Sequence, residues 1–317
     1  MFMALNASNL EDKPSLDKID KKIMYAYSQN CRLNQKKLAS KLRISPEKLH
    51  YRINKLKKHL LKPGVVIDPI GVGLNMYFLF VNHISEDEYE IYSSQDEVYL
   101  ASKVIGHKEL ISVVLTNNLE EFLTKNLPNN NVNVHSIKQI VPDNFNGFNV
   151  DMKTSKTPKT KPMNFKNSHF EILHATIQHP ENTPFELSQK IDYDYRTIRK
   201  YQDELHNNGI IKKWRYEADI FKMGFQLYLL HVQTTPNNVN NVLHYQHQDK
   251  YSGFLFKSYT NLFFWYMPKK VQELDTFIQN LRQKYTIQRI DVYQIGTNYK
   301  INMNPPQLQK HIQKQIL

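Results

Sequence analysis

Residues 45–58 read Ser45-Pro-Glu-Lys-Leu-His-Tyr-Arg-Ile-Asn-Lys-Leu-Lys-Lys58, a stretch with the features of a short amphipathic helix. Ser45 is a favourable N-cap residue, and Pro46 fits the first helical position, where its missing N–H would have no partner in any case. Leu49, Ile53 and Leu56 recur at helical spacing and predict a narrow buried stripe. The opposite side carries polar and basic residues: Glu47, Lys48, His50, Tyr51, Asn54, Lys55 and Lys58. Such a helix fits the major groove of DNA, but a solvated surface helix has the same pattern.

The residues before this stretch favour the DNA-binding interpretation. The apolar face of residues 16–27 predicts one helix, and Asn34 is placed to cap a second helix from Gln35 to Leu42. A three-residue turn then leads into the amphipathic stretch, which is the plan of a helix-turn-helix motif. Lys62-Pro63-Gly64 ends the helical pattern, and Val65-Val66-Ile67 predicts a strand. We therefore expect a winged helix-turn-helix.

The charge of the chain is concentrated in this same segment. The whole chain has a net charge of +12, and residues 16–62 contain 14 basic and three acidic residues, a local net charge of +11. A polyanionic partner, double-stranded DNA, is expected to bind there. The single cysteine, Cys31, excludes an intrachain disulfide and fits a reducing cytoplasm. The sequence shows no signal peptide and no apolar run long enough to span a bilayer, so we expect a cytoplasmic protein without a membrane partner.

Four motifs resemble the feast/famine (Lrp/AsnC) family of transcription regulators. They are Leu16-Asp-Lys-Ile-Asp-Lys-Lys-Ile23, Lys37-Leu-Ala-Ser-Lys-Leu42, Ile44-Ser-Pro and Tyr51-Arg-Ile-Asn-Lys-Leu56. The family opens with an L-D-x-x-D-x-x-I-L-like helix, continues with K-x-L-A-x-x-L, and ends its recognition helix with R-I-x-x-L. The resemblance implies a winged helix followed by a ferredoxin-like effector and dimerisation domain, the RAM domain. The alternating and helical patterns of residues 76–141 fit that βαββαβ order.

The pattern of the first half of the sequence recurs in the second half. A shift of 149 residues aligns Ile23 with Ile172 and Leu56 with Leu205, and a shift of 151 aligns Tyr77 with Tyr228. We interpret this as a tandem duplication and predict an α+β fold of two tandem units, each a winged helix-turn-helix followed by a ferredoxin-like domain. The predicted boundaries are a disordered lead at 1–14, winged helices at 15–64 and 166–213, RAM-like domains at 65–142 and 214–300, a linker at 143–165, and a tail at 301–317.

In the first winged helix, the position of each residue predicts the part of the DNA that it contacts. The N-terminal half of a recognition helix meets base edges, which selects Glu47, Lys48, His50 and Tyr51 as readers. For Tyr51, packing at the helix edge is an equally good interpretation. Phosphate contacts are predicted for Lys55, Lys58, Arg43 and Lys37, and Ser45 is counted with them. Arg52 matches the arginine of the family motif, and we predict a brace to the second helix or the DNA backbone.

The second winged helix is predicted to bind DNA weakly or not at all. Arg196, Arg199 and Lys200 are its candidate phosphate contacts, but Asp203 and Glu204 share their face and would repel phosphates. Both sheets lie in one chain, so one polypeptide can imitate a family dimer. We also expect a homo-oligomer, a dimer of such chains, because the strands are rich in aromatic residues. Those aromatics have a second interpretation as core residues.

The resemblance to this family also has implications for ligand binding and catalysis. Many family members bind an amino acid at a G-x-Y-D-like turn, and the matching positions here are Gly106, His107, Glu109, Tyr259 and Asn261, although both copies depart from the motif. An amino acid or another small molecule is thus the effector that this resemblance allows, and we expect no cofactor and no metal. Siroheme decarboxylases share the plan, but only His107 matches their histidine-rich run, and the local charge of +11 has no role in such an enzyme. We therefore expect no catalytic residues and a protein that is not an enzyme.

Overall fold

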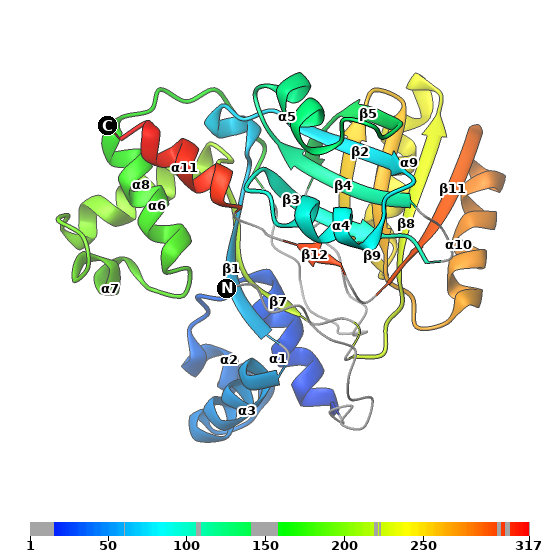
Figure 1. Cartoon of the computed structure of the whole chain (residues 1–317). Helices are drawn as coiled ribbons and strands as arrows, with labels where there is room; N and C mark the ends of the chain where they lie inside the picture. The colour runs from blue at the N-terminus through cyan, green and yellow to red at the C-terminus, as the bar shows by residue number, and fades with distance from the viewer. Residues whose placement is uncertain are drawn as a thin grey trace.

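The computed structural model describes residues 16–59, 61–105, 109–140, 158–218, 221, 223–296, 299–301 and 305–316. Within these ranges the chain passes twice through a three-helix head, a linking strand and a sheet unit, which confirms the predicted α+β fold of winged helices and ferredoxin-like units (Figure 1). The lead and most of the predicted linker lie outside the described residues, so those expectations stay predictions. In the described part of the chain, no helix has the length and apolar character needed to cross a lipid bilayer.

The first head is formed by helices whose ends are set by capping side chains. Asp17 caps the first helix, the Asn34 carboxamide accepts the N–H of Lys37 at 3.0 Å, and the Ser45 hydroxyl accepts the N–H of Lys48 at 3.2 Å. The predicted caps at Asn34 and Ser45 are therefore confirmed. The helices are α1 (Lys18–Gln29), α2 (Gln35–Leu42) and α3 (Pro46–His59).

Each head is followed by a linking strand and a sheet unit with two helices. The first half continues with β1 (Leu61–Ile67), η1 (Ile70–Val72), β2 (Met76–Asn82), α4 (Glu86–Ser93), β3 (Val98–Lys103), β4 (Glu109–Leu115), α5 (Leu119–Asn126), β5 (Val132–Ser136) and β6 (Lys138–Ile140). The second head contains α6 (Asn167–Gln178), α7 (Pro184–Ser188) and α8 (Tyr195–Asn207). It is followed by β7 (Ile211–Ala218), β8 (Leu227–Thr234), η2 (Pro236–Asn238), α9 (Val239–Gln248), β9 (Ser252–Ser258), β10 (Asn261–Tyr266), α10 (Val271–Lys284), β11 (Ile287–Ile295), β12 (Lys300–Ile301) and α11 (Pro306–Lys314).

The two sheets exchange their last strands. Their strand orders are β12-β3-β4-β2-β5 and β11-β8-β10-β9-β6. Strand β6 of the first half pairs with β9 of the second, and β12 of the second half pairs with β3 of the first. Each sheet therefore needs a strand from the other half, which interlocks the two halves of the chain.

The linking strands β1 and β7 pair with each other in antiparallel register, from Leu61 opposite Ala218 to Ile67 opposite Ile211. Each strand also completes the core of the opposite head. The buried valines of β1 share a core with Leu173 and Leu205 of the second head. Tyr216 of β7 is buried in the core of the first head. The two heads are thus attached to one another through this ribbon.

A polar contact joins the heads directly. The Arg32 guanidinium donates from Nη1 to Oε1 of the buried Gln202 at 2.9 Å and from Nε to the carbonyl of Pro180 at 3.0 Å. Its Cζ lies 4.8 Å from the centre of the Trp214 ring. Burial lowers the pKa of Arg32 to about 10, so the group stays charged at neutral pH. Gln202, the polar residue at a predicted core position of the second head, is therefore satisfied by the first head.

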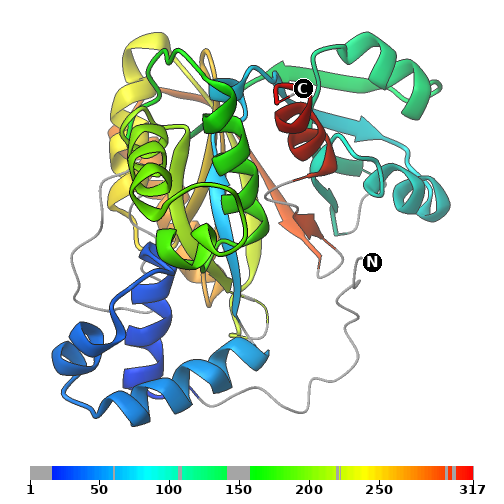
Figure 2. The ribbon, with the colours of Figure 1, turned by 90° about the vertical axis from the view of Figure 1, so that its left-hand side faces the viewer.

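The C-terminal helix α11 ties the second head to the first sheet unit, and Figure 2 shows it lying between them. Leu308 and Ile312 are fully buried on one side of this helix. Nε2 of His311 donates to the carbonyl of Val72 at 2.8 Å, and Lys310 forms an ion pair with Asp96. The last residues of the chain are thus a structural clamp rather than a loose tail.

The aromatic strand residues form the core between the sheets. Phe78 of β2 stacks on Phe263 of β10 with ring centroids 4.4 Å apart, and both side chains are fully buried. This arrangement agrees with their interpretation as core residues and leaves less aromatic surface for self-association than the sequence suggested. Two histidines lie in the same layer: His231 of β8 stacks on Phe263 at 4.7 Å, and His135 of β5 lies 5.7 Å from His231.

The first prediction concerns the contact between the heads. Arg32→Ala leaves Oε1 of Gln202 without its charged donor, and it should lower the free energy of unfolding by about 2 kcal/mol. Urea denaturation followed by tryptophan fluorescence is a direct measurement, since Trp214 lies against the guanidinium. Arg43→Ala, an exposed arginine of the same head, is the matched control and should change the stability by less than about 0.5 kcal/mol. Equal effects of the two substitutions would contradict the proposed role of Arg32.

The second prediction concerns acid stability. Burial, and then the nearby His231, lower the pKa of His135 below its ordinary value of 6.5. The unfolded chain then binds more protons at this residue, so the free energy of unfolding should fall as the pH falls through and below 6.5. His135→Phe should flatten this dependence by less than about 1.4 kcal/mol per pH unit, because solvent partly screens the half-buried ring. Denaturation curves over a pH series measure the slope, and an unchanged slope in H135F would refute the assignment.

Candidate nucleic-acid interface

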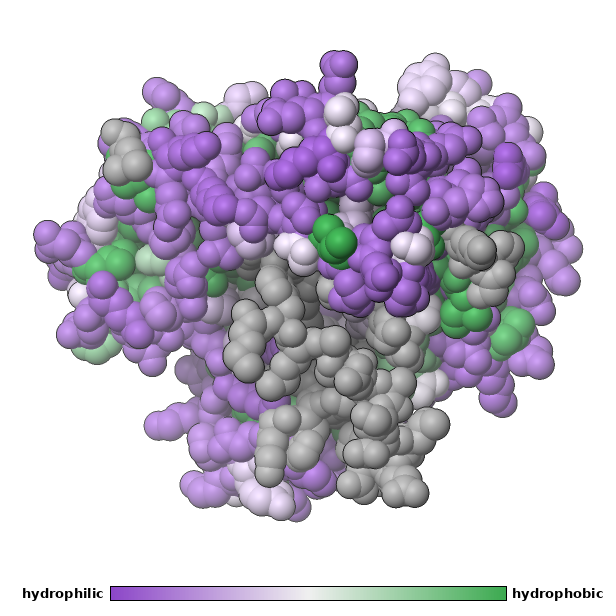
Figure 3. Space-filling model, viewed as in Figure 1, coloured by the Kyte–Doolittle hydropathy of each residue, from purple (hydrophilic) through white to green (hydrophobic). Residues whose placement is uncertain are grey.

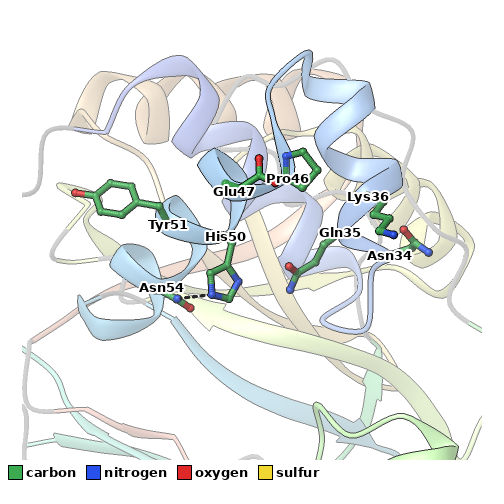
Figure 4. A pocket seen from close by; sticks show the side chains of 8 residues that line it. All are labelled: Asn34, Gln35, Lys36, Pro46, Glu47, His50, Tyr51 and Asn54. Atoms are coloured by element: carbon green, nitrogen blue, oxygen red, sulfur yellow. Dashed lines mark hydrogen bonds between the residues drawn. The ribbon is translucent and has the colours of Figure 1, made fainter.

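An open groove lies between the N-terminal ends of α2 and α3. It has a volume of about 870 Å³ and is lined by Asn34, Gln35, Lys36, Pro46, Glu47, His50, Tyr51 and Asn54 (Figure 4). Gln35 and His50 point into it from the two helices. The N-terminal ends of both helices border this groove, where the helix dipoles favour bound anions such as phosphates, and the acidic Glu47 lies in the first turn of α3. In Figure 1 the head carrying this groove projects at the bottom of the molecule.

Helix α3 has the predicted two faces. Leu49, Ile53 and Leu56 are buried in the core of the first head. The other face is exposed, with Glu47, Lys48, His50, Tyr51, Asn54 and Lys55 all open to solvent. The side chain of Lys58 lies outside the described residues. Nothing in the described part of the chain covers the basic face of α3, so a duplex has access to it.

The polar residues on this face differ in their contacts and in their exposure. His50 and Asn54 are hydrogen-bonded to each other at 3.0 Å, one helical turn apart, so they present a joined polar pair. Tyr51 is one of the residues that line the groove (Figure 4), and it is 69% exposed. This exposure contradicts the interpretation of Tyr51 as a packing residue at the helix edge. The phenol is free to contact a partner.

Arg52 has an intramolecular role. Its Nη1 lies 2.7 Å from an Asp17 carboxylate oxygen and 2.6 Å from one of Asp20. Asp17 is the cap of α1, so the guanidinium joins the start of α1 to α3. The predicted brace of Arg52 to the second helix is wrong, because its partner is the first helix. With both acids engaged, Arg52 no longer ranks among the free cations of the head.

The other predicted phosphate contacts of the first head, Lys37 and Arg43, are also exposed. Lys37 is exposed in the first turn of α2, and Arg43 is exposed in the turn between α2 and α3, where its φ of 56° is left-handed. Among the described residues, no acidic side chain forms an ion pair with Lys37, Arg43, Lys48 or Lys55. Lys57, by contrast, pairs with Glu181 of the second head and lies 5.1 Å from the Tyr216 ring. It therefore contributes to the junction of the heads.

The second head presents a different charge pattern. Arg196, Arg199 and Lys200 are exposed on α8, as the sequence predicted for candidate contacts. However, Nε of Arg199 lies 3.9 Å from the Asp203 carboxylate one turn further along the helix. Glu204 lies 2.8 Å from His169. Asp203 and Glu204, the acidic residues that we expected to repel phosphates, therefore lie on the same helix as Arg196 and Arg199.

The predicted effector positions are only partly described. Gly106 and His107 lie outside the described residues. Glu109 begins β4, Tyr259 is exposed at the turn between β9 and β10, and the side-chain oxygen of Asn261 accepts a hydrogen bond from Nε2 of His231 at 2.8 Å. Asn261 is thus already engaged, and an effector site at these positions stays a prediction.

The sequence analysis missed the histidine pair between the sheets. Nδ1 of His231 lies 3.3 Å from the Asp291 carboxylate, which also accepts from Nε of Arg289 at 2.8 Å. Nε2 of His135 is buried and has no hydrogen-bond partner in the described part of the molecule. No pattern in the sequence links His135 to His231, which lies almost a hundred positions later.

Comparisons with known proteins support the first head most directly. A family model described as winged helix-turn-helix DNA-binding matches residues 16–59, which span α1 to α3. No curated protein matches the chain. The structure of AsnC from E. coli is 21% identical, with 38% of this chain and 92% of AsnC covered, but its TM-score of 0.34 is too low to carry a conclusion.

Two solved structures share the architecture of nearly the whole chain. One is the siroheme decarboxylase NirDL, with a TM-score of 0.59, 13% identity, and 95% of this chain and 98% of that chain covered. The other is NirDL in complex with an iron-uroporphyrin III analogue, with a TM-score of 0.60, 13% identity, and coverage of 95% and 99%. At this identity the likeness establishes the fold. Because these full-length matches are to an enzyme, they contradict the expectation that this chain is not an enzyme.

Proposed function

We propose that the chain is a sequence-specific DNA-binding transcription regulator whose first winged helix is the main DNA contact. The observation that carries this proposal is the uncovered basic face of α3 beside a groove bordered by two helix N-termini. The matched family model is described as DNA-binding and covers this head. The net charge of +11 over residues 16–62 supplies the attraction to a polyanion.

Contacts can be assigned from the positions of the side chains. Lys48, His50 and Tyr51 lie on the N-terminal half of α3, which in helix-turn-helix proteins meets base edges in the major groove. Lys55 lies further along the helix, where contacts go to phosphates. Lys37 of α2 and Arg43 of the turn before α3 are exposed, and contacts from them to phosphates would fix the register of the head on the duplex.

The rest of the chain supports this role in the proposal. The interlocked sheet units hold the two heads at one separation, and they are where a small-molecule effector would act. We interpret the repeated succession of elements as a tandem duplication that lets one chain replace a dimer. The second head contributes less to DNA binding, since acids accompany its basic residues.

The third prediction tests the DNA-binding surface. Lys48→Ala together with Lys55→Ala should weaken binding to genomic DNA fragments. It should also reduce the slope of log K against log salt concentration by about one, because the phosphate contact assigned to Lys55 is lost, while Lys48 is assigned to a base edge. Fluorescence anisotropy across a salt series measures both quantities. Circular dichroism should be unchanged, because both lysines are exposed.

Arg196→Ala together with Lys200→Ala, on the second head, is the matched control for this experiment. This variant should change the salt slope clearly less than the first. Equal changes would refute the unequal contribution of the heads, and an unchanged slope in the first variant would refute the proposed surface.

We propose as a second candidate that the chain acts on a tetrapyrrole that carries carboxyl groups. Its support is the architecture shared with NirDL over 95% of the chain, together with the name of that protein and of its bound analogue. The residues of this chain that would face such chemistry are His135 and His231, which lie among aromatic rings between the sheets. Histidine at such a position can transfer a proton, and Arg289 nearby can attract a carboxylate.

The fourth prediction tests this candidate on the full chain. Titration with iron uroporphyrin should shift the visible absorption band of the porphyrin and saturate. The Lys48→Ala, Lys55→Ala variant should retain the shift, because its changes lie on the first head. An unchanged spectrum, in a preparation that binds DNA, would exclude the tetrapyrrole candidate and leave the regulator.

A further inference from the structure

The helices of the two heads follow one another in the same order and at a constant offset in the sequence. Helices α6, α7 and α8 each begin 149 residues after α1, α2 and α3: Asn167 follows Lys18, Pro184 follows Gln35, and Tyr195 follows Pro46. Residues 149 apart therefore occupy the same places in the two motifs. The groove of the first head can be compared position by position with the corresponding surface of the second head.

Two of the groove positions have become aromatic in the second head. Lys36 and Pro46 line the groove of the first head, and the residues 149 positions later are Phe185 and Tyr195. Phe185 is 64% exposed and Tyr195 is 45% exposed. Large apolar side chains exposed together on a surface usually mark a place where another molecule binds. In Figure 3, apolar atoms interrupt the hydrophilic surface of the second head at the left of the molecule.

The charges around these aromatics balance. Four acidic residues are exposed on this side of the head: Glu186, Asp192, Asp194 and Asp203. Four basic residues are exposed with them: Lys190, Arg196, Arg199 and Lys200. Such a surface attracts a phosphate backbone weakly, because acid and base contributions cancel. It can, however, match a surface of the same mixed charge.

Other parts of the chain cover some faces of the second head. Ile198, Gln202 and Leu205 of α8 are buried in the molecule, and α11 packs against α6. The surface of α7 and the start of α8 is left uncovered by the described part of the chain. This uncovered surface carries the two exposed aromatic residues, Phe185 and Tyr195.

We propose that this surface, centred on Phe185 and Tyr195, docks against the same surface of a second copy of the chain. In a twofold dimer the same surface of both copies forms the contact, so if residue A of one copy touches residue B of the other, residue B of the first also touches residue A of the second. A surface that carries equal numbers of acidic and basic residues can therefore be complementary to itself. Exposed Phe, Tyr and Arg are the residue types enriched at protein interfaces. The first head could not pair with itself in this way, because its net charge of +11 would repel its copy. The contact would leave both first heads of the dimer free.

The occupant follows from charge complementarity. A strongly basic or acidic partner would gain little from a surface with four charges of each sign, whereas a second copy brings both signs. The Cζ atom of Arg196 lies 5.8 Å from the centre of the Tyr195 ring. In the proposed dimer, Arg196 would form an ion pair with an acidic residue of the second copy, while Tyr195 packs against the surface of that copy. The inference does not depend on DNA binding by the first head.

Sedimentation velocity of the full chain, over a wide range of protein concentration, tests the proposal. The wild-type chain should dimerise, and Phe185→Ser should raise the dimer dissociation constant at least about tenfold, as expected for an aromatic residue at the centre of an interface. Ile91→Ser is the matched control: Ile91 is 66% exposed on α4, and its substitution should have no effect. A monomeric wild-type chain, or a dimer that is insensitive to F185S, would overturn the proposal.

A cross-linking experiment gives an independent measurement. The native Cys31 is the only cysteine, it is buried, and burial raises its thiol pKa to about 12, so it does not compete. Phe185→Cys should form a covalent dimer on mild oxidation, and Ile91→Cys should not. Equal cross-linking of the two would overturn the proposal. So would loss of DNA binding in F185S with the molecular mass unchanged, since the surface would then be a DNA contact.

Discussion

The antiparallel pairing of β1 with β7 is the constraint on which the rest of the structure depends. Each strand leaves one head, pairs with its counterpart, and enters a sheet unit, so both heads and both sheets are attached to the same ribbon. Each strand also fills the core of the opposite head, with Val65 and Val66 beneath the second head and Tyr216 beneath the first. Neither half has a complete core without the other, because the apolar surface of each is buried by the other.

The exchange of β6 and β12 extends the same principle to the sheets. An edge strand supplied by the other half satisfies backbone groups that would otherwise be exposed at a sheet edge. Arg32, inserted between the heads, and α11, clamped across α6 and the first sheet unit, remove further freedom. The relative placement of the two heads is therefore fixed by many contacts, and a flexible linker does not set it.

This shared frame carries two heads with different surfaces. The first head exposes a basic helix face, and its three internal cations, Arg32, Arg52 and Lys57, hold the structure together. At the groove positions of the second head, Phe185 replaces Lys36 and Asp203 replaces Asn54, while Arg196 replaces Glu47. Core positions such as Leu56 and Leu205 are apolar in both heads, Gln202 stands in place of Ile53, and exposed positions such as Lys36 and Phe185 differ. The likeness to NirDL is one of fold, and the two candidate functions differ in the features that they use: the charged surface of the first head, or the histidine layer between the sheets.

The sequence by itself determined the local structure of this protein. The caps Asn34 and Ser45, the stripe of Leu49, Ile53 and Leu56, and the 149-residue recurrence could all be predicted, because helix ends and periodicity depend on neighbours a few residues apart. The tertiary structure alone decided the strand exchange, the pairing of Arg52 with the first helix, the contact of Arg32 with Gln202, and the meeting of His135 with His231. These contacts join residues separated by tens to more than a hundred positions. Strand order and packing determine which residues meet, and neither produces a repeating pattern in the sequence from which the pairs could be predicted.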